Sequence, residues 1–417
     1  MNELDALWAF LVAALVALLV TPLVARLAHR VGAVDAPSDR GLHDRPMPYL
    51  GGLSILAGVL LAGAVFIPMG ADTRGILAGA AAIAVIGAVD DAIDLHAGLK
   101  LIGQTAAAVI PVASGVTVED ISIPLVGIVD LGGAGAVLTV VGIVAVMNVV
   151  NFTDGVDGLA AGVCTIAAAT LAVIALSLAD AAVNPTSEGA EDRFAAGVLA
   201  AATAGAAIGF LRHNFHPASI FMGDSGSNLL GLLLACVAVQ GVLKTAAVVA
   251  LVFPLVILAV PILDSGFVIA KRIKYRRPVY EADRWHFHHR FANIGFSQRR
   301  TVVYLYAWTL SLAALALALR FVPYSDGVGN FHAGWTVVIV AFGLVAVAAS
   351  VYLVYVLEIL KFRRFRTRQL RREAVASGKA PPPEGAIEEE VEREVETGDF
   401  EAVDRPGTGE YEAVGPR

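Results

Sequence analysis

Residues 75–94 read GILAGAAAIAVIGAVDDAID, an apolar run that ends on two adjacent carboxylates, Asp90 and Asp91. Ionisable side chains at the edge of a membrane-spanning segment are costly, so they are more typical of functional sites than of lipid contact. Paired aspartates also occur where a solvated loop begins, and the motif alone favours that plainer interpretation. The functional interpretation of the pair becomes stronger because polar groups also lie at the ends of other apolar segments in the chain.

The composition argues against a soluble enzyme of this length. Of the 417 residues, 57% are hydrophobic and only 16% are charged, and the mean hydropathy is +0.72. The charged residues gather between apolar stretches of about 20 residues, which is the length that crosses a bilayer as a helix. The sequence therefore predicts an all-α polytopic membrane protein.

The apolar stretches predict about eleven transmembrane helices. They lie at residues 6–28, 50–69, 75–90, 99–115, 134–150, 158–179, 194–211, 228–242, 245–270, 301–320 and 333–357. Between the fourth and fifth of them, residues 116–133 (VTVEDISIPLVGIVDLGG) alternate weakly between apolar and polar side chains. This alternation indicates a short β-hairpin, which the span count places on the extracytoplasmic side.

Lysine and arginine are distributed unevenly between the two sides, with 26 of the 30 on one of them. Because basic loops stay in the cytoplasm, we predict a multi-pass plasma-membrane protein with its N-terminus outside. The chain divides into a membrane-embedded domain, residues 1–360, and a cytoplasmic tail, residues 361–417. Within the tail, a basic run at 361–372 suits anionic headgroups. Residues 373–417 follow with 13 acidic and 4 basic side chains, a composition typical of disorder.

Alternating span directions bring five polar loops to the cytoplasmic face. In or beside these loops are His43; Asp90, Asp91 and Lys100; Asn148, Asn151, Asp154 and Asp157; Asn214, Phe221 and Asp224; and His286, His288, His289 and Arg290. Each motif alone has a plainer interpretation, such as a turn, a helix cap or an exposed patch. Five such clusters on one face indicate a shared site.

The chemistry of this set favours phosphoryl transfer. Carboxylate and amide oxygens without cysteine suit Mg²⁺, or Mn²⁺, better than zinc. A phosphate-bearing substrate would supply further oxygens and bind Lys100 and the arginines.

The alternative is a transporter that carries protons or cations on its carboxylates. Transporters usually place such groups near the bilayer midplane at related broken helices. Here they lie at span ends on one side, which favours an enzyme.

Four motifs, taken in order, resemble those of the polyprenyl-phosphate N-acetylhexosamine-1-phosphate transferases. They are VDDAIDL (89–95), NVVNFTDGVDGLAAG (148–162), FMGDSGSNLLG (221–231) and DRWHFHHR (283–290). The resemblance covers about residues 5–360. It implies transfer of a sugar-1-phosphate from a UDP-sugar to a polyprenyl phosphate, with release of UMP and a need for magnesium. The acceptor phosphate would attack the β-phosphorus either directly or through an aspartyl-phosphate intermediate.

The resemblance, together with the polar loops themselves, gives an expected role to each candidate residue. The catalytic set would be Asp90, Asp91, His286, His288 and His289. The metal site would comprise Asp224 with Asn151 as companion. Substrate contacts would come from His43, Lys100, Asn148, Asp154, Asp157, Asn214, Phe221 and Arg290. Which aspartate of the pair orients the acceptor phosphate stays open.

Two features resemble the N-acetylglucosamine-1-phosphate branch of this family: the His-x-His-His pattern and the loop DAPSDRGLHDRPMPYLGG (35–52). The loop departs from the branch at Gly41 and Tyr49, where lysine and arginine are common. The expected donor is therefore UDP-N-acetylglucosamine, and the alternative is a UDP-MurNAc-pentapeptide. The expected partners are the UDP-sugar, the polyprenyl phosphate and the membrane, without nucleic acid, and a homodimer is compatible with this assignment.

Overall fold

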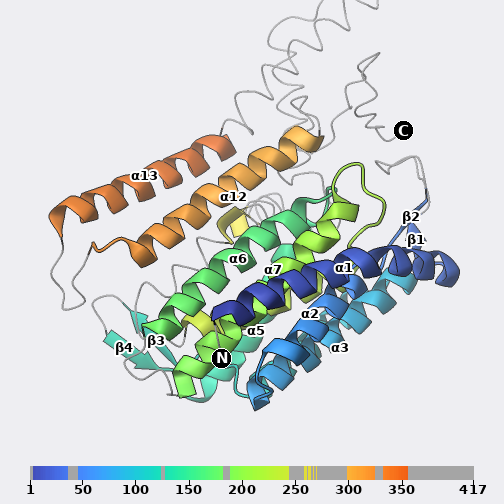
Figure 1. The fold of residues 1–417 in the computed structure, drawn as a ribbon, viewed down its shortest axis with the longest axis horizontal. Coiled ribbons are helices and arrows are strands. Elements are labelled where there is room, and N and C mark those ends of the chain that lie inside the picture. Colours follow the sequence, from blue (N-terminus) through green and yellow to red (C-terminus); the bar gives the residue numbers. More distant parts are fainter. Residues whose placement is uncertain are drawn as a thin grey trace, which may run out of the picture.

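The computed structural model describes residues 3–35, 46–123, 127–181, 188–243, 298–324 and 332–355, with a few positions between 258 and 269. This part of the chain is a bundle of helices with two small hairpins (Figure 1). The helices are α1 (Glu3–Val31), α2 (Gly52–Phe66), α3 (Ala71–Ile93), α4 (Ala97–Ala113), α5 (Gly133–Thr153), α6 (Leu159–Asp180), α7 (Glu188–Asn214), α8 (Gly223–Ala238), α12 (Gln298–Phe321) and α13 (Ala333–Tyr355). A short π-helical segment, Val239–Leu243, extends α8.

The predicted fold class is confirmed, whereas the count of eleven spans is not. Among the described residues, eight helices are long and apolar enough to cross a membrane, namely α1, α3, α5, α6, α7, α8 with its extension, α12 and α13. The apolar helices α2 and α4 are shorter. These ten helices coincide with ten of the predicted segments. The remaining one, 245–270, lies mostly outside the described residues, and the tail at 361–417 lies wholly outside them.

Two antiparallel hairpins lie at opposite ends of the bundle (Figure 1). Strands β3 (Asp120–Ile123) and β4 (Gly127–Asp130) pair between α4 and α5, which confirms the hairpin predicted at 116–133. Strands β1 (Val34–Asp35) and β2 (Met47–Pro48) follow α1 and precede α2. Each has only two residues, too few to produce an alternating pattern that a sequence could reveal.

The interior of the bundle is built from small residues on α7 and from α8, whose membrane-length window is entirely buried. A Cβ atom on Gly205 would come within 2.1 Å of the Phe10 carbonyl oxygen, and one on Gly209 within 2.2 Å of the Ala14 oxygen. The backbones of α1 and α7 are therefore in direct contact, as small residues permit between membrane helices. This packing fixes the loop after α7, which leads into α8.

Helices α12 and α13 form an outer layer over α6 (Figure 1). The Tyr306 hydroxyl on α12 donates to the carbonyl oxygen of Gly158 at 2.5 Å, just before α6 begins. On the other face of α12, the Trp308 indole donates to Ser350 Oγ of α13 at 2.8 Å. The first contact holds the start of α6 against α12, and the second joins α12 to α13.

Candidate active site

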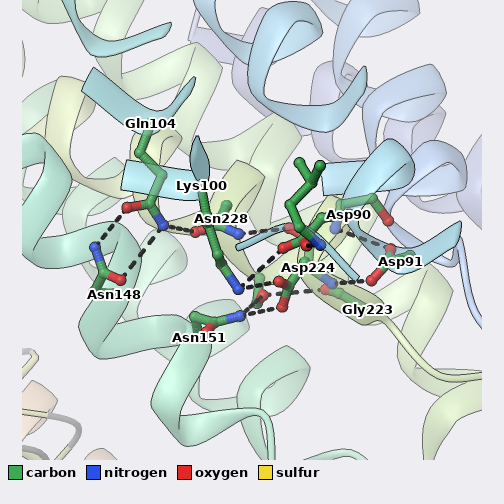
Figure 2. A network of polar contacts seen from close by, with 12 residues as sticks. Asp90, Asp91, Lys100, Gln104, Asn148, Asn151, Gly223, Asp224 and Asn228 are labelled. Atoms are coloured by element: carbon green, nitrogen blue, oxygen red, sulfur yellow. Dashed lines mark hydrogen bonds and ion pairs between the residues drawn. The ribbon is translucent and has the colours of Figure 1, made fainter. Parts of the chain in front are cut away.

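Four helix ends meet around a network of polar side chains and carry the predicted carboxylates Asp90, Asp91 and Asp224 (Figure 2). They are the C-terminal ends of α3 and α5 and the N-terminal ends of α4 and α8. Together they bring Asp90, Asp91, Lys100, Asn151 and Asp224 into one hydrogen-bonded network. The sequence predicted that these residues would share one face, and the structure brings them into contact.

Asp224, in the first turn of α8, lies at the centre of this network. Its Oδ1 atom accepts a hydrogen bond from Asn151 Nδ2 at 2.5 Å, and its Oδ2 atom forms an ion pair with the Lys100 ammonium. The same ammonium lies 3.2 Å from Asp90 Oδ2. Lys100 therefore links two carboxylates that come from different helices and offsets their mutual repulsion.

The paired aspartates face different partners. Asp90 is buried, and its Oδ1 atom accepts from the backbone N–H of Leu95 at 2.7 Å, while Oδ2 faces Lys100. Asp91 accepts instead from two backbone N–H groups of α8, those of Asp224 and Ser225. Adjacent carboxylates on α3 thus make contacts of different kinds.

A chain of amide side chains supports Asp224 from inside the bundle (Figure 2). Asn148 donates to Gln104 at 2.8 Å, Gln104 donates to Asn228 at 2.8 Å, and Asn228 donates to the carbonyl oxygen of Asp224 at 2.9 Å. The sequence analysis missed Gln104 and Asn228. The available signal was spacing, since each lies four residues after a site residue, Lys100 or Asp224, and thus on the same helix face.

A second polar cluster surrounds the turn between α5 and α6. Asp157 Oδ2 accepts from the Ala218 N–H at 3.1 Å and lies 3.0 Å from His216 Nδ1. Asn214 is buried, accepts from the Gly158 N–H at 3.0 Å and donates to the Ile220 carbonyl oxygen at 3.0 Å. The predicted residues Asp157 and Asn214 thus lie in one cluster. The sequence analysis missed His216, which carried no motif of its own.

Phe221 follows this second cluster and stands beside Tyr49. The two ring centroids are 5.7 Å apart and the rings are inclined at 48°. The backbone carbonyl of Phe221 accepts from the N–H of Gly51 at 3.1 Å, so the segment before α2 is joined to the segment before α8. Tyr49, where the family pattern often has arginine, therefore contributes an aromatic ring next to Phe221.

The negative charge concentrated at this site changes the pKa of Asp154, which lies at the end of α5. Burial, together with the charges of Asp224, Asp91 and Asp157, raises its pKa to about 8. An unfolded chain would release this proton near pH 4. Because the folded state binds the proton more tightly, the metal-free protein should lose stability as the pH rises from about 4 to about 8.

Asp154→Asn removes this titration. In detergent with EDTA, the variant should therefore melt a few degrees above the wild type at pH 8.5, with a smaller gain at pH 5.5. Thermal unfolding at both pH values measures the difference. An equal shift at the two pH values, or a lower melting temperature at pH 8.5, would contradict the electrostatic explanation.

The remaining predicted residues, His43, His286, His288, His289 and Arg290, lie outside the described residues. Within the described ranges, no group of three or more His, Cys, Asp and Glu side chains is arranged to hold a metal by itself. The donors that are present nevertheless suit Mg²⁺. It is commonly held by one or two carboxylates together with waters and substrate phosphates. Asp224 and the neighbouring Asn151 amide offer such a partial set of hard oxygen ligands.

Known proteins are similar in sequence to this chain over about three quarters of its length. Residues 73–242 match glycosyl transferase family 4. A probable undecaprenyl-phosphate N-acetylglucosaminyl 1-phosphate transferase of Bacillus subtilis is 38% identical over 314 residues, 74% of this chain and 84% of the relative. A decaprenyl-phosphate N-acetylglucosaminephosphotransferase of Mycobacterium leprae is 36% identical over 341 residues, 76% and 84% respectively. A phospho-N-acetylmuramoyl-pentapeptide-transferase of Desulforudis audaxviator is 35% identical over 344 residues, 74% and 96%.

The family match, residues 73–242, covers the helices α3, α4, α5 and α8 that carry the clustered polar side chains. The motif resemblance, the polytopic helical fold and the similarity to several transferases agree with one another. The chain belongs to the polyprenyl-phosphate N-acetylhexosamine-1-phosphate transferase family, within glycosyl transferase family 4.

Proposed function

We propose that this protein transfers N-acetylglucosamine-1-phosphate from UDP-N-acetylglucosamine to a polyprenyl phosphate and releases UMP, with Mg²⁺ as cofactor. The observation that carries the proposal is the cluster of Asp90, Lys100, Asn151 and Asp224 at one end of a membrane bundle. Such a position suits a soluble phosphorylated donor that meets a phosphate held by the lipid. The names of the relatives from Bacillus subtilis and Mycobacterium leprae support the N-acetylglucosamine donor.

In this reaction an oxygen of the acceptor phosphate forms a bond to the β-phosphorus of the donor. The bond from that phosphorus to the bridging oxygen breaks, and UMP leaves with the electron pair. A bound Mg²⁺ would neutralise the diphosphate and stabilise the leaving phosphate. Asp224, with Asn151 as companion, would hold the ion, and Lys100 would add positive charge beside the phosphates.

Asp90 is the better candidate of the pair to face the acceptor phosphate. Its Oδ2 atom contacts a side chain, Lys100, whereas both oxygens of Asp91 accept backbone N–H groups. A phosphomonoester has a second pKa near 6 and is largely ionised at neutral pH. Asp90 would therefore contribute mainly by orienting the phosphate and less by removing a proton.

The nucleoside would lie toward the second cluster. Phe221 offers an aromatic face, and Asp154 and Asp157 flank the turn before α6. The histidine loop, with His286, His288, His289 and Arg290, and His43 are proposed to act on the phosphates. Because 26 of the 30 lysines and arginines fall on the side of these loops, we place the site in the cytoplasm.

A donor panel tests the proposed function. Purified protein in detergent, with Mg²⁺ and a polyprenyl phosphate, should release UMP from UDP-N-acetylglucosamine and form a diphosphate-linked lipid. UDP-MurNAc-pentapeptide should be a poor donor, at least about tenfold lower in kcat/KM. UMP release and mass spectrometry of the lipid are the readouts.

Two other outcomes of the panel would change the assignment. Preference for the pentapeptide donor would move the protein to the branch of the Desulforudis audaxviator relative and retain the phosphoryl-transfer chemistry. Absence of UMP release from every UDP-sugar, together with solute flux in liposomes, would favour the transporter alternative. Family membership argues against that second outcome.

A further inference from the structure

We propose that Asp91 is a positioning residue that caps the N-terminus of α8 from the neighbouring helix α3 and thereby fixes Asp224. The proposal deepens the proposed function and rests on the metal-binding role given there to Asp224. It separates the paired aspartates by function, with Asp90 directed toward the reacting groups and Asp91 toward the backbone of α8.

The contacts of Asp91 are those of a helix cap. The first N–H groups of any α-helix lack partners within the helix. The residue that precedes α8, Met222, supplies no side-chain cap. Asp91 supplies both acceptors instead, since Oδ1 accepts from the Asp224 N–H at 2.7 Å and Oδ2 accepts from the Ser225 N–H at 3.2 Å (Figure 2). A carboxylate at this place is also favoured by the helix dipole.

Backbone packing holds the two helices close enough for this cap. Gly223 has a φ of +70°, and a Cβ atom there would lie 2.4 Å from Asp91 Oδ2. One turn earlier on α3, a Cβ atom on Gly87 would lie 2.5 Å from the Cα atom of Ser225. Glycine at both positions therefore lets α3 approach the first turn of α8 and seats the Asp91 carboxylate against it.

The cap determines where the Asp224 carboxylate points. The backbone of Asp224 is held at its N–H by Asp91 and at its carbonyl by Asn228. Loss of Asp91 would free the N–H end, and the carboxylate would no longer be fixed toward Asn151 and Lys100. Substitution of residues that orient a metal ligand typically weakens metal affinity about 10- to 100-fold.

Mn²⁺ binding to the purified full-length protein, measured by electron paramagnetic resonance without substrates, tests this inference. Asp91→Ala should raise the Mn²⁺ Kd about 10- to 100-fold. Asp91→Asn should weaken Mn²⁺ binding less than Asp91→Ala does, because an asparagine oxygen caps a helix about as well as an aspartate oxygen. Asp224→Asn is the same conservative exchange as Asp91→Asn, but it changes the proposed metal ligand itself. This variant should therefore lose Mn²⁺ binding.

Two further variants complete the set. Asp94→Asn is the matched control for charge, because Asp94 is an exposed residue on the same helix end with a φ of +53°, which asparagine also adopts. It should leave the Mn²⁺ Kd unchanged. Gly223→Ala retains every carboxylate but would push Asp91 away, so it should reproduce the weaker Mn²⁺ binding of Asp91→Ala. It also keeps the inference testable if Asp91→Ala fails to fold.

Distinct results would overturn the inference and the proposed function. Wild-type affinity in Asp91→Ala or in Gly223→Ala would overturn the inference alone. Equal losses in Asp91→Asn, Asp91→Ala and Asp224→Asn would make Asp91 a direct ligand and would also overturn it. If the wild type binds no Mn²⁺, the proposed metal site fails and the inference fails with it.

Discussion

Asp224→Asn should leave a folded protein whose turnover is lower by about 10³-fold. A metal ion that stabilises developing charge contributes several kcal/mol to the transition state, and about 1.4 kcal/mol corresponds to a tenfold change in rate. The exchange removes the negative charge but retains the size of the side chain. Lys100 would still have Asp90 as a partner at 3.2 Å, so the helix ends should stay together.

UMP release over a range of Mg²⁺ concentrations measures this effect. The variant should require more Mg²⁺ or remain inactive at every concentration. An unchanged elution profile in size-exclusion chromatography is the control for folding. Wild-type turnover at the wild-type Mg²⁺ requirement would remove Asp224 from the metal site.

Asp90→Asn should lower turnover by about 10²- to 10⁴-fold, the range for a side chain that orients or exchanges a proton with a reacting group. The KM for the UDP-sugar should change less than about threefold, because the loss falls on the transition state rather than on donor binding. Steady-state kinetics with varied donor at saturating acceptor separates the two parameters. If only the donor KM rose, Asp90 would belong to the nucleotide site.

The contrast between Asp90 and Asp91 adds a second comparison to this experiment. Asp94→Asn removes a charge from the same end of α3 and should retain nearly full turnover. Addition of Mg²⁺ should restore more activity to Asp91→Asn than to Asp90→Asn, because the first change acts through metal affinity and the second does not. Equal rescue of the two variants would indicate that the pair acts as one unit.

Much of the architecture could be predicted from the sequence because its physical cause is local. A helix in a bilayer must satisfy its own backbone hydrogen bonds, so an apolar run of sufficient length already specifies a helix. The β3–β4 hairpin was also predictable, because apolar and polar side chains alternate along residues 116–133. The two-residue strands β1 and β2 depend on contacts made by the folded chain, and no local pattern marks them.

The site was predictable at its charged residues and less so at its uncharged ones. Asp90, Asp91 and Asp224 stand out because carboxylates are rare beside apolar runs. Gln104 and Asn228 do not, because a single amide barely changes the hydropathy of its helix. The contact between Asp91 and Asp224 joins residues 133 positions apart and involves a backbone N–H, which every residue except proline possesses. No motif could therefore distinguish the role of Asp91 from that of Asp90.

Lys100 has a consequence for how the protein is made. Its ammonium joins Asp90 of α3 to Asp224 of α8 through a side chain that is part of α4. The positive charge that compensates these two carboxylates is thus part of the polypeptide itself. It is present while the chain is inserted into the membrane. Three helices that are synthesised at different times can therefore associate in the lipid before any divalent cation or substrate arrives. Biogenesis of the bundle should accordingly be insensitive to magnesium supply, and only its turnover should respond to it.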